Sequence, residues 1–176
     1  MDDYATGVLE DIYREEISFK FRPGITNVNH IKIATNQTPF FAYDYLNFQI
    51  KEFSFDHPDF LQDDYQIYFS QVAKIARITM KNLMNHHKRS DHFHIGSANY
   101  KMAKILRQLF KNNRLREIEL PLVGQFHLYT PNNGSRKAPR IHFFVGPISA
   151  LYITLYDPYH EIYPVPHLIS ENTNAA

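Results

Sequence analysis

The chain has 176 residues, of which 44% are hydrophobic and 21% charged, so it is long enough to bury a sizeable core as one domain. It contains no cysteine, which excludes disulfide scaffolds, thiolate metal sites and cysteine nucleophiles. The net charge is only +1, no apolar run approaches the roughly 18–20 residues of a membrane span, and the first residues are acidic and polar, unlike a signal peptide. We therefore expect a soluble, cytoplasmic protein with no membrane partner.

The pattern of apolar residues predicts a mixture of helices and strands. In chain order, the expected elements are a short helix over 6–19, strand-like pairs within 39–55, a long helix over 59–85, a second helix over 98–111, and strands over 115–120, 125–130, 140–145 and 150–156. Ser97 is the expected N-cap of the second helix, and Asn133-Gly134 is a strong turn signal. The connection VGPIS is too short for a parallel crossover, so the last two strands should form an antiparallel hairpin. We expect one α+β domain over 1–168, with helices packed on one face of an antiparallel sheet of about four to six strands, and a flexible tail over 169–176.

The last strands alternate between apolar and polar side chains. One face of the sheet should be apolar and carry Ile141, Phe143 and Val145 from one strand and Leu151, Ile153 and Leu155 from the next. The opposite face and its rim should collect His127, Tyr129, Arg140, His142, Tyr152 and Tyr156, followed by Asp157 and His160. These residue types indicate a site that binds phosphate and transfers protons, and they also suit an ordinary solvated sheet face.

Such a set of side chains suits RNA cleavage without a metal. A 2′-hydroxyl must lose a proton, the leaving 5′-oxygen must gain one, and the phosphorane needs a cation. Arg140 is the expected phosphate clamp, and His142, His160 and Tyr163 are the expected proton-transfer groups. In this interpretation Asp157 orients His160, which titrates near neutrality. In the alternative, the segment is only a turn, the Asp157 carboxylate binds backbone amides and His160 is solvated.

Charge is distributed unevenly along the chain. Residues 1–76 carry 6 Lys/Arg against 12 Asp/Glu, residues 77–140 carry 13 against 3, and residues 141–176 carry none against 3. The basic middle segment predicts salt-dependent binding of nucleic acid, with RNA as the expected ligand. Its candidate contacts are Arg107, Lys111, Arg114, Arg116, Arg136 and Lys137. The acidic, aromatic-rich N-terminal half is a candidate surface for a protein partner, and the alternative is that the acidic and basic parts simply cover each other in the fold.

The C-terminal half resembles a known family. The helical segment KMAKILRQLFKNN is followed by LREIELPLVGQFHLYT and then by RIHFFVGPISALYITLYDPYHEIYP. This order resembles the C-terminal half of RelE/ParE-type ribosome-associated ribonuclease toxins, in which helices precede a four-stranded antiparallel sheet. Arg140 matches the arginine that opens a strand in that family, and His160 and Tyr163 match the terminal pair in the loop that follows. The resemblance implies a toxin-like ribonuclease, although this chain is longer than such toxins and has an additional acidic N-terminal half.

Weaker patterns lie before the second helix. RSDHFH fits the Arg-x4-His signature of HEPN-type ribonucleases, which are all-helical. His92 and His94 would share one side of an extended segment, where they could bind zinc with His86, His87 or Asp91. With neither cysteine nor HExxH in the chain, we expect no metal and no cofactor. The alternative to a ribonuclease is a non-enzymatic nucleic-acid- or protein-binding module of a phage or mobile element.

Overall fold

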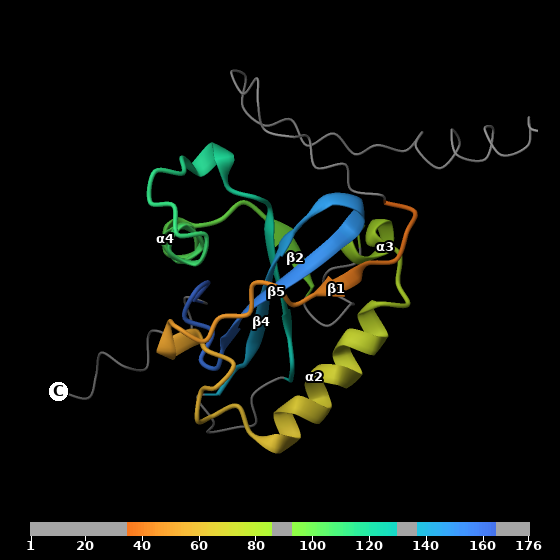
Figure 1. The fold of residues 1–176 in the computed structure, drawn as a ribbon. Helices are drawn as coiled ribbons and strands as arrows, with labels where there is room; N and C mark the ends of the chain where they lie inside the picture. Colours follow the sequence, from red (N-terminus) through yellow and green to blue (C-terminus); the bar gives the residue numbers. More distant parts are fainter. Residues whose placement is uncertain (1–34, 86–92, 130–136, 165–176) are drawn as a thin grey trace, which may run out of the picture.

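The computed structural model describes residues 35–85, 93–129 and 137–164 (Figure 1). The expected helix over 6–19, the Asn133-Gly134 turn and the C-terminal tail lie outside these residues. The described residues form an α+β fold with a mostly antiparallel sheet, so the predicted fold class is confirmed.

The centre of the domain is a five-stranded sheet with the strand order β1-β5-β4-β3-β2. Its strands are β1 (Phe40–Ala42), β2 (His94–Gly96), β3 (Val123–His127), β4 (Arg140–Val145) and β5 (Ala150–Asp157). Neighbouring strands are antiparallel except for β1, which pairs parallel with β5. The expected hairpin of the last two strands is confirmed, with Val145 paired to Leu151 beside the connection. Of the strand-like run over 39–55, only β1 enters the sheet.

Three helices flank the sheet in the described residues: α2 (Gln62–Ile75), α3 (Met80–Asn85) and α4 (Tyr100–Leu109). The single helix predicted over 59–85 is therefore interrupted before Met80. The cause is tertiary, because the backbone N–H groups of Met80 and Lys81 donate to the carbonyls of Gln37 (2.9 Å) and Thr35 (2.8 Å). Those donors are satisfied by a segment far away in the sequence instead of by the preceding helical turn.

The start of α4 also differs from the prediction. Asn99, not Ser97, caps the helix, and its side-chain oxygen accepts the N–H of Met102 at 2.8 Å. The strand predicted over 115–120 is instead a short 3-10 turn at Glu117–Glu119. There the Glu119 carboxylate accepts the backbone N–H of Arg116 at 2.8 Å, which closes the turn locally.

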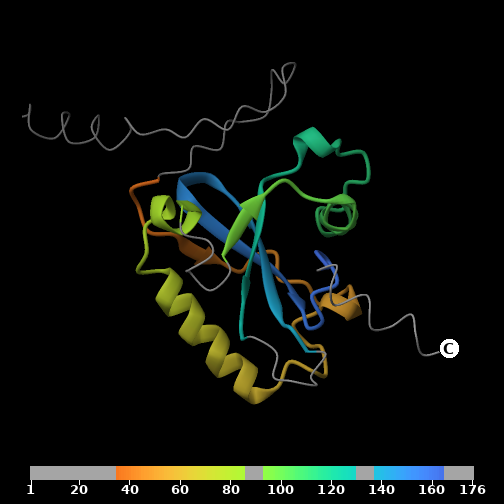
Figure 2. The ribbon, with the colours of Figure 1, turned by 180° about the vertical axis from the view of Figure 1, so that it is seen from behind.

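Helices cover both faces of the sheet, which corrects the expectation of a single covered face (Figure 2). On one face, called the α2 side, Tyr68, Ile75, Met80 and Leu83 of α2 and α3 belong to a core shared with Phe126, Ile141 and Phe143. On the other, called the α4 side, Met102, Ile105 and Leu106 share a core with Val123, Phe144 and Leu155. The reason is that β4 and β5 are buried along nearly their whole length, so both of their faces need a cover.

A β-bulge in β5 changes which side chains meet on each face. His142 pairs with Leu155 but Phe143 pairs with Ile153, so Thr154 is an extra residue, and its hydroxyl donates to the His142 carbonyl at 3.0 Å. Beyond the bulge the alternation is reversed. Asp157 therefore pairs with Arg140 on the α4 side. The predicted places of Leu155 and Tyr156 on opposite faces are exchanged.

Candidate functional site

A buried pair of ionisable side chains, His142 and Asp157, lies where β4 and β5 meet on the α4 side. Nε2 of His142 is 3.4 Å from Oδ2 of Asp157, and both side chains are fully buried. The Asp157 carboxylate also accepts the backbone N–H groups of Glu161 and Ile162, each at 2.9 Å. Burial alone would raise the pKa of Asp157, but His142 and these two N–H groups outweigh it and hold that pKa below its usual value. Asp157 is therefore ionised at neutral pH and fastens the following loop to the end of β5.

This arrangement agrees with the turn interpretation in one respect and contradicts it in another. The carboxylate binds backbone amides, as the turn interpretation predicted, and its nearest imidazole is that of His142, not of His160. The same interpretation was wrong about His160, which is only 7% exposed. The sequence did not reveal this pairing, because the alternation of apolar residues gives no sign of the β-bulge that turns Asp157 toward His142.

His160 is held in an unusual backbone conformation beside the pair. Its φ is 57°, in the left-handed region that non-glycine residues seldom adopt. Nε2 of His160 is 3.4 Å from Nε2 of Gln125 on β3. Burial, assisted by the positive charge of Arg140, lowers the pKa of His160 to about 4. His160 is therefore neutral at pH 7, which corrects the expectation that it titrates near neutrality.

Tyr163 connects the loop to the start of α4. Its ring stacks on His142, with centroids 5.9 Å apart and an interplanar angle of 25°. Its hydroxyl oxygen accepts the N–H of Asn99 at 3.4 Å, and the Asn99 side-chain amide donates to the Ile162 carbonyl at 2.6 Å. Burial raises the pKa of Tyr163, so its hydroxyl stays protonated at neutral pH. The role of Asn99 in joining α4 to this loop was not foreseen.

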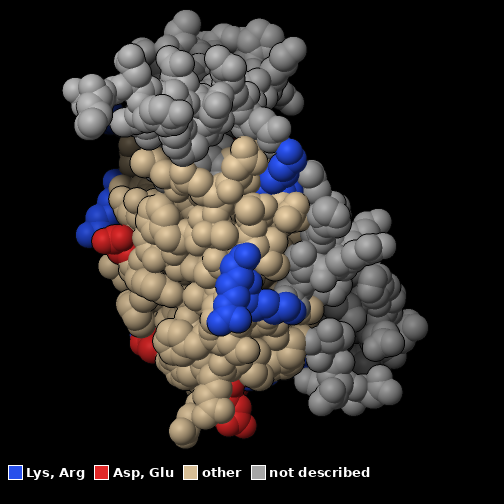
Figure 3. Space-filling view, turned by 90° about the vertical axis from the view of Figure 1, so that its right-hand side faces the viewer, with Lys and Arg blue, Asp and Glu red and all other residues tan. Residues whose placement is uncertain are grey.

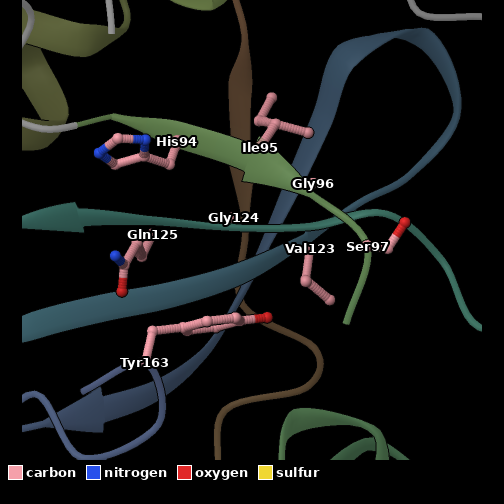
Figure 4. Close-up of a pocket in the computed structure, with 8 residues that line it drawn as sticks. All are labelled: His94, Ile95, Gly96, Ser97, Val123, Gly124, Gln125 and Tyr163. Atoms are coloured by element: carbon pink, nitrogen blue, oxygen red, sulfur yellow. The ribbon is translucent and has the colours of Figure 1, made fainter. Parts of the chain in front are cut away.

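A pocket of about 260 Å³ opens beside the cluster (Figure 4). It is lined by His94, Ile95, Gly96, Ser97, Val123, Gly124, Gln125 and Tyr163. Figure 4 shows β2 and β3 side by side along the pocket, with the Tyr163 ring across from them. Gly124 is required there, because a Cβ on it would lie 2.2 Å from Cζ of Phe143 and 2.4 Å from the carbonyl oxygen of His94. The pocket adjoins the buried cluster through Gln125, which meets His160, and Tyr163, which stacks on His142.

The four predicted catalytic residues are brought together, but only one of them lines the pocket. Tyr163 does so, whereas His142 lies behind its ring and His160 behind Gln125. Arg140 opens β4 opposite Asp157 and its Nη1 donates to the carbonyls of Ala138 (3.2 Å) and Pro139 (3.1 Å). Burial lowers the pKa of Arg140, although Asp157 acts in the opposite direction.

The other residues predicted for the polar face are divided between the two sides of the sheet. His127 and Tyr152 lie on the α4 side, but Tyr129 and Tyr156, predicted to join them, pack on the α2 side.

Several buried polar atoms of the cluster have no hydrogen-bond partner among the described residues. They are Oε1 of Gln125, both ring nitrogens of His142 and Nδ1 of His160. The 3.4 Å approach of His142 Nε2 to Asp157 Oδ2 thus lacks the alignment of a hydrogen bond. Buried groups of this kind cost free energy and usually have a functional reason or bind water or a ligand.

The predicted nucleic-acid contacts are divided between two parts of the surface. Arg107, Lys111, Arg114 and Arg116 lie in the second half of α4 and the loop after it. Of these, Arg107 donates to the Leu115 carbonyl at 2.6 Å and Arg116 pairs with Glu119 at 3.0 Å, whereas Lys111 and Arg114 are exposed. Lys137 is on the α2 side, paired with the Asp64 carboxylate beside Tyr129, and Arg136 lies outside the described residues.

The described residues hold no group of three His, Cys, Asp or Glu side chains that could bind a metal ion. Of the proposed zinc ligands, His86, His87, Asp91 and His92 lie outside the described ranges, as does the arginine of the RSDHFH motif. His94 is described, and it stands on β2 at the pocket instead of on a helix. Across the described ranges, none of the helices has the length and apolar character needed to cross a membrane.

The class that these residues define is an α+β domain with a buried His–Asp pair beside a pocket. Comparisons of the chain with models of protein families, with curated proteins and with solved structures found no match. The resemblance to RelE/ParE-type toxins is not tested by them and stays a prediction.

Proposed function

We propose that the pocket between β2, β3 and Tyr163 is the active site of a metal-independent ribonuclease. The observation that carries this proposal is that Tyr163 lines the pocket while His142 lies against its ring, His160 lies against the pocket residue Gln125, and Arg140 is close enough to His160 to lower its pKa. The unpartnered polar atoms behind this wall of the pocket support the proposal, because unsatisfied buried polar groups usually have a functional reason. The predicted likeness to ribonuclease toxins points to the same class of substrate.

The burial of each residue suggests its role. Tyr163 lines the pocket with a protonated hydroxyl, so it is the group that donates to a phosphate or to the leaving 5′-oxygen. His94 is exposed on the opposite strand edge and offers an imidazole to take the proton of a 2′-hydroxyl. His142 and Asp157 are fully buried, so they act by holding Tyr163 and the loop in place. Arg140 contributes positive charge next to this wall.

The test is cleavage of a labelled single-stranded RNA by the purified chain in the presence of EDTA. We expect cleavage that EDTA does not reduce and that a 2′-deoxy substitution at the cut site abolishes, because the 2′-oxygen is the nucleophile. Tyr163→Phe should slow cleavage by about 10²-fold or more, the usual contribution of a general acid. Tyr159→Phe is the matched control, because Tyr159 is an exposed tyrosine that bonds to Asp59 and does not line the pocket. Absence of cleavage by the wild type on every RNA tried would refute the proposal.

The rival function is a non-enzymatic module that binds nucleic acid or a protein. It is favoured by the exposed aromatic side chains in the acidic N-terminal half, where Phe40, Tyr43, Tyr45, Phe48, Tyr65 and Phe69 are all more than 40% exposed. If the module binds nucleic acid, RNA should bind at low salt without being cut. Replacing the exposed Lys111 and Arg114 by Gln should then lower the slope of log K against log salt by about 0.7 to 0.9 for each charge removed. Lys51→Gln, on an exposed lysine paired with Asp56, is the control and should leave the slope unchanged.

A further inference from the structure

A surface groove lies along the end of α2 and combines apolar and basic side chains. It is lined by Ser70, Ala73, Lys74, Arg77 and Ile78, from the last turns of α2 and the residues just after it. Ala73 and Ile78 make part of the lining apolar, whereas Lys74 and Arg77 are exposed and supply two positive charges. The groove therefore suits a partner segment that carries both acidic and apolar side chains.

No acidic residue of the same stretch offsets this charge. Residues 65–85 contain two lysines and one arginine but no Asp or Glu. The nearest carboxylate of α2 belongs to Asp64, ten residues before Lys74, which is about 15 Å along the helix. That separation exceeds the screening length of about 8 Å at physiological ionic strength. Figure 3 faces this side and shows basic atoms in the middle of the described surface, with acidic atoms only toward its left and lower edges.

The N-terminal segment joins the described residues beside this groove. The first described residue is Thr35, whose carbonyl accepts the N–H of Lys81 at 2.8 Å, and the Gln37 carbonyl accepts the N–H of Met80 at 2.9 Å. Ile78, which lines the groove, precedes Met80 by only two residues. Figures 1 and 2 both show the start of the described chain next to α3. The residues before Thr35 are therefore attached at the edge of the groove.

The first 16 residues have the composition that the groove requires. They contain six acidic residues against one arginine, a net charge of −5, and the apolar residues Leu9, Ile12 and Tyr13. The acidic residues are Asp2, Asp3, Glu10, Asp11, Glu15 and Glu16. The 18 residues 17–34, which include no Asp or Glu, connect this segment to Thr35 and could span up to about 60 Å when extended. Because α2 is only about 21 Å long, residues 1–16 can reach every part of the groove.

We propose that residues 1–16 bind in the groove of their own chain, with carboxylates against Lys74 and Arg77 and apolar side chains against Ala73 and Ile78. A segment of the same chain is favoured over a separate partner, because sites joined by a short linker meet at effective concentrations of up to about millimolar. The contact covers two exposed cations, so it competes with any other polyanion for them. It involves no residue of the pocket and does not depend on RNA cleavage.

A spin label in the segment tests the proposal, because the chain has no cysteine of its own and Thr6→Cys can be labelled selectively. In the whole chain labelled with ¹⁵N, the nitroxide should broaden the amide resonances of Ser70, Ala73 and Arg77. The resonance of Gln108, on α4, should keep its intensity. Unchanged intensities at the groove overturn the proposal, and if Lys74→Gln with Arg77→Gln then weakens RNA binding, nucleic acid is the occupant instead. Broadening that persists when the spin label and ¹⁵N are on different copies assigns the groove to a second chain and also overturns it.

Charge reversal tests which groups meet. Lys74→Glu with Arg77→Glu should abolish the broadening at the groove, because the acidic segment is then repelled. The matched control is Lys104→Glu with Arg114→Glu, an exposed lysine and arginine on the α4 side, and it should leave the broadening unchanged. Circular dichroism should show that both double variants remain folded.

Adding Asp11→Lys and Glu15→Lys to the reversed groove should restore the broadening, because opposite charges face each other again. Broadening that survives reversal of the groove overturns the proposal. So does a failure of the added lysines to restore it, because the carboxylates of the segment then do not meet Lys74 and Arg77.

Discussion

The two sides of the sheet bury different chemistry. On the α2 side the core is a continuous set of aromatic and aliphatic side chains, such as Phe126 between Phe143 and Tyr68. On the α4 side an apolar core under the helix adjoins buried His142, Asp157 and His160. Apolar burial contributes about 25 cal/mol for each Å², whereas buried ionisable groups cost free energy unless they are paired and hydrogen-bonded. The α2 side therefore contributes to stability, whereas the polar cluster on the α4 side lowers it. Such clusters are found at functional sites.

The largest expected effect comes from breaking the α2-side core. Phe143 is fully buried, and its ring stacks on Phe93 at 5.2 Å. Phe143→Ala should lower the free energy of unfolding by about 3 to 5 kcal/mol, because it removes a large buried ring and leaves a cavity. The exposed Phe48→Ala, the matched control, should change it by less than about 0.5 kcal/mol. Urea denaturation followed by circular dichroism measures both, and a loss of under 1 kcal/mol for Phe143→Ala would contradict the assignment of the main core to this side.

A smaller effect is expected from the anchor of the α4-side loop. Asp157→Asn keeps the size of the side chain but replaces one of two accepting oxygens by a donor that faces a backbone N–H. The loss in stability should be about 2 to 3 kcal/mol at pH 7, since a buried N–H loses its partner. The free energy of unfolding of the wild type should also fall at acid pH as Asp157 is protonated, and the variant should lack this decrease. The folded pKa of Asp157 is lowered, so its contribution is present above the unfolded pKa of about 3.9 and is lost as pH falls through the folded pKa.

The control for Asp157→Asn is Asp63→Asn, because Asp63 is exposed at the start of α2. It should change the free energy of unfolding by less than about 0.5 kcal/mol. Its stability should still decrease at acid pH as that of the wild type does. If the two substitutions have equal effects, the Asp157 carboxylate is not an anchor and the polar cluster loses its structural basis.

The smallest expected effect is a pH dependence that arises at His160. Its folded pKa of about 4 is below the unfolded value of about 6.5, so the unfolded chain binds the proton first. The contribution of neutral His160 is therefore present above about pH 6.5 and is lost as pH falls toward 4, a change on the order of 2 kcal/mol. His160→Asn should remove this dependence, and asparagine tolerates the left-handed backbone there. Thermal melts of both proteins at about pH 7, 5.5 and 4.5 measure this dependence. If the melting temperatures of the two proteins change with pH in parallel, His160 is not buried as described.

Local patterns in the sequence determined the elements whose signals are short-range. The alternation in RIHFFV and ALYITLY and the short VGPIS between them predicted β4, β5 and their hairpin with nearly the observed limits. The three- and four-residue spacing around Ile105 and Leu106 predicted α4 in the same way. Proximity along the chain also placed His160 and Tyr163 near the end of β5. These features depend on periodicity and loop length, which neighbouring residues specify without help from the rest of the fold.

Only the tertiary structure decided the rest, because it depends on bonds between distant segments. The interruption between α2 and α3 arises from carbonyls at Thr35 and Gln37, and β1 joins the sheet by a parallel pairing to β5 about 110 residues away. Because of the bulge at Thr154, Asp157 lies beside His142. Strict alternation with a period of two residues would have placed Tyr156 on that face instead. Asn99 and Gln125 joined the site for the same reason, since each touches the loop after β5 across a long separation in sequence. The sequence thus indicated which residue types suit the site, and long-range register decided which of them meet.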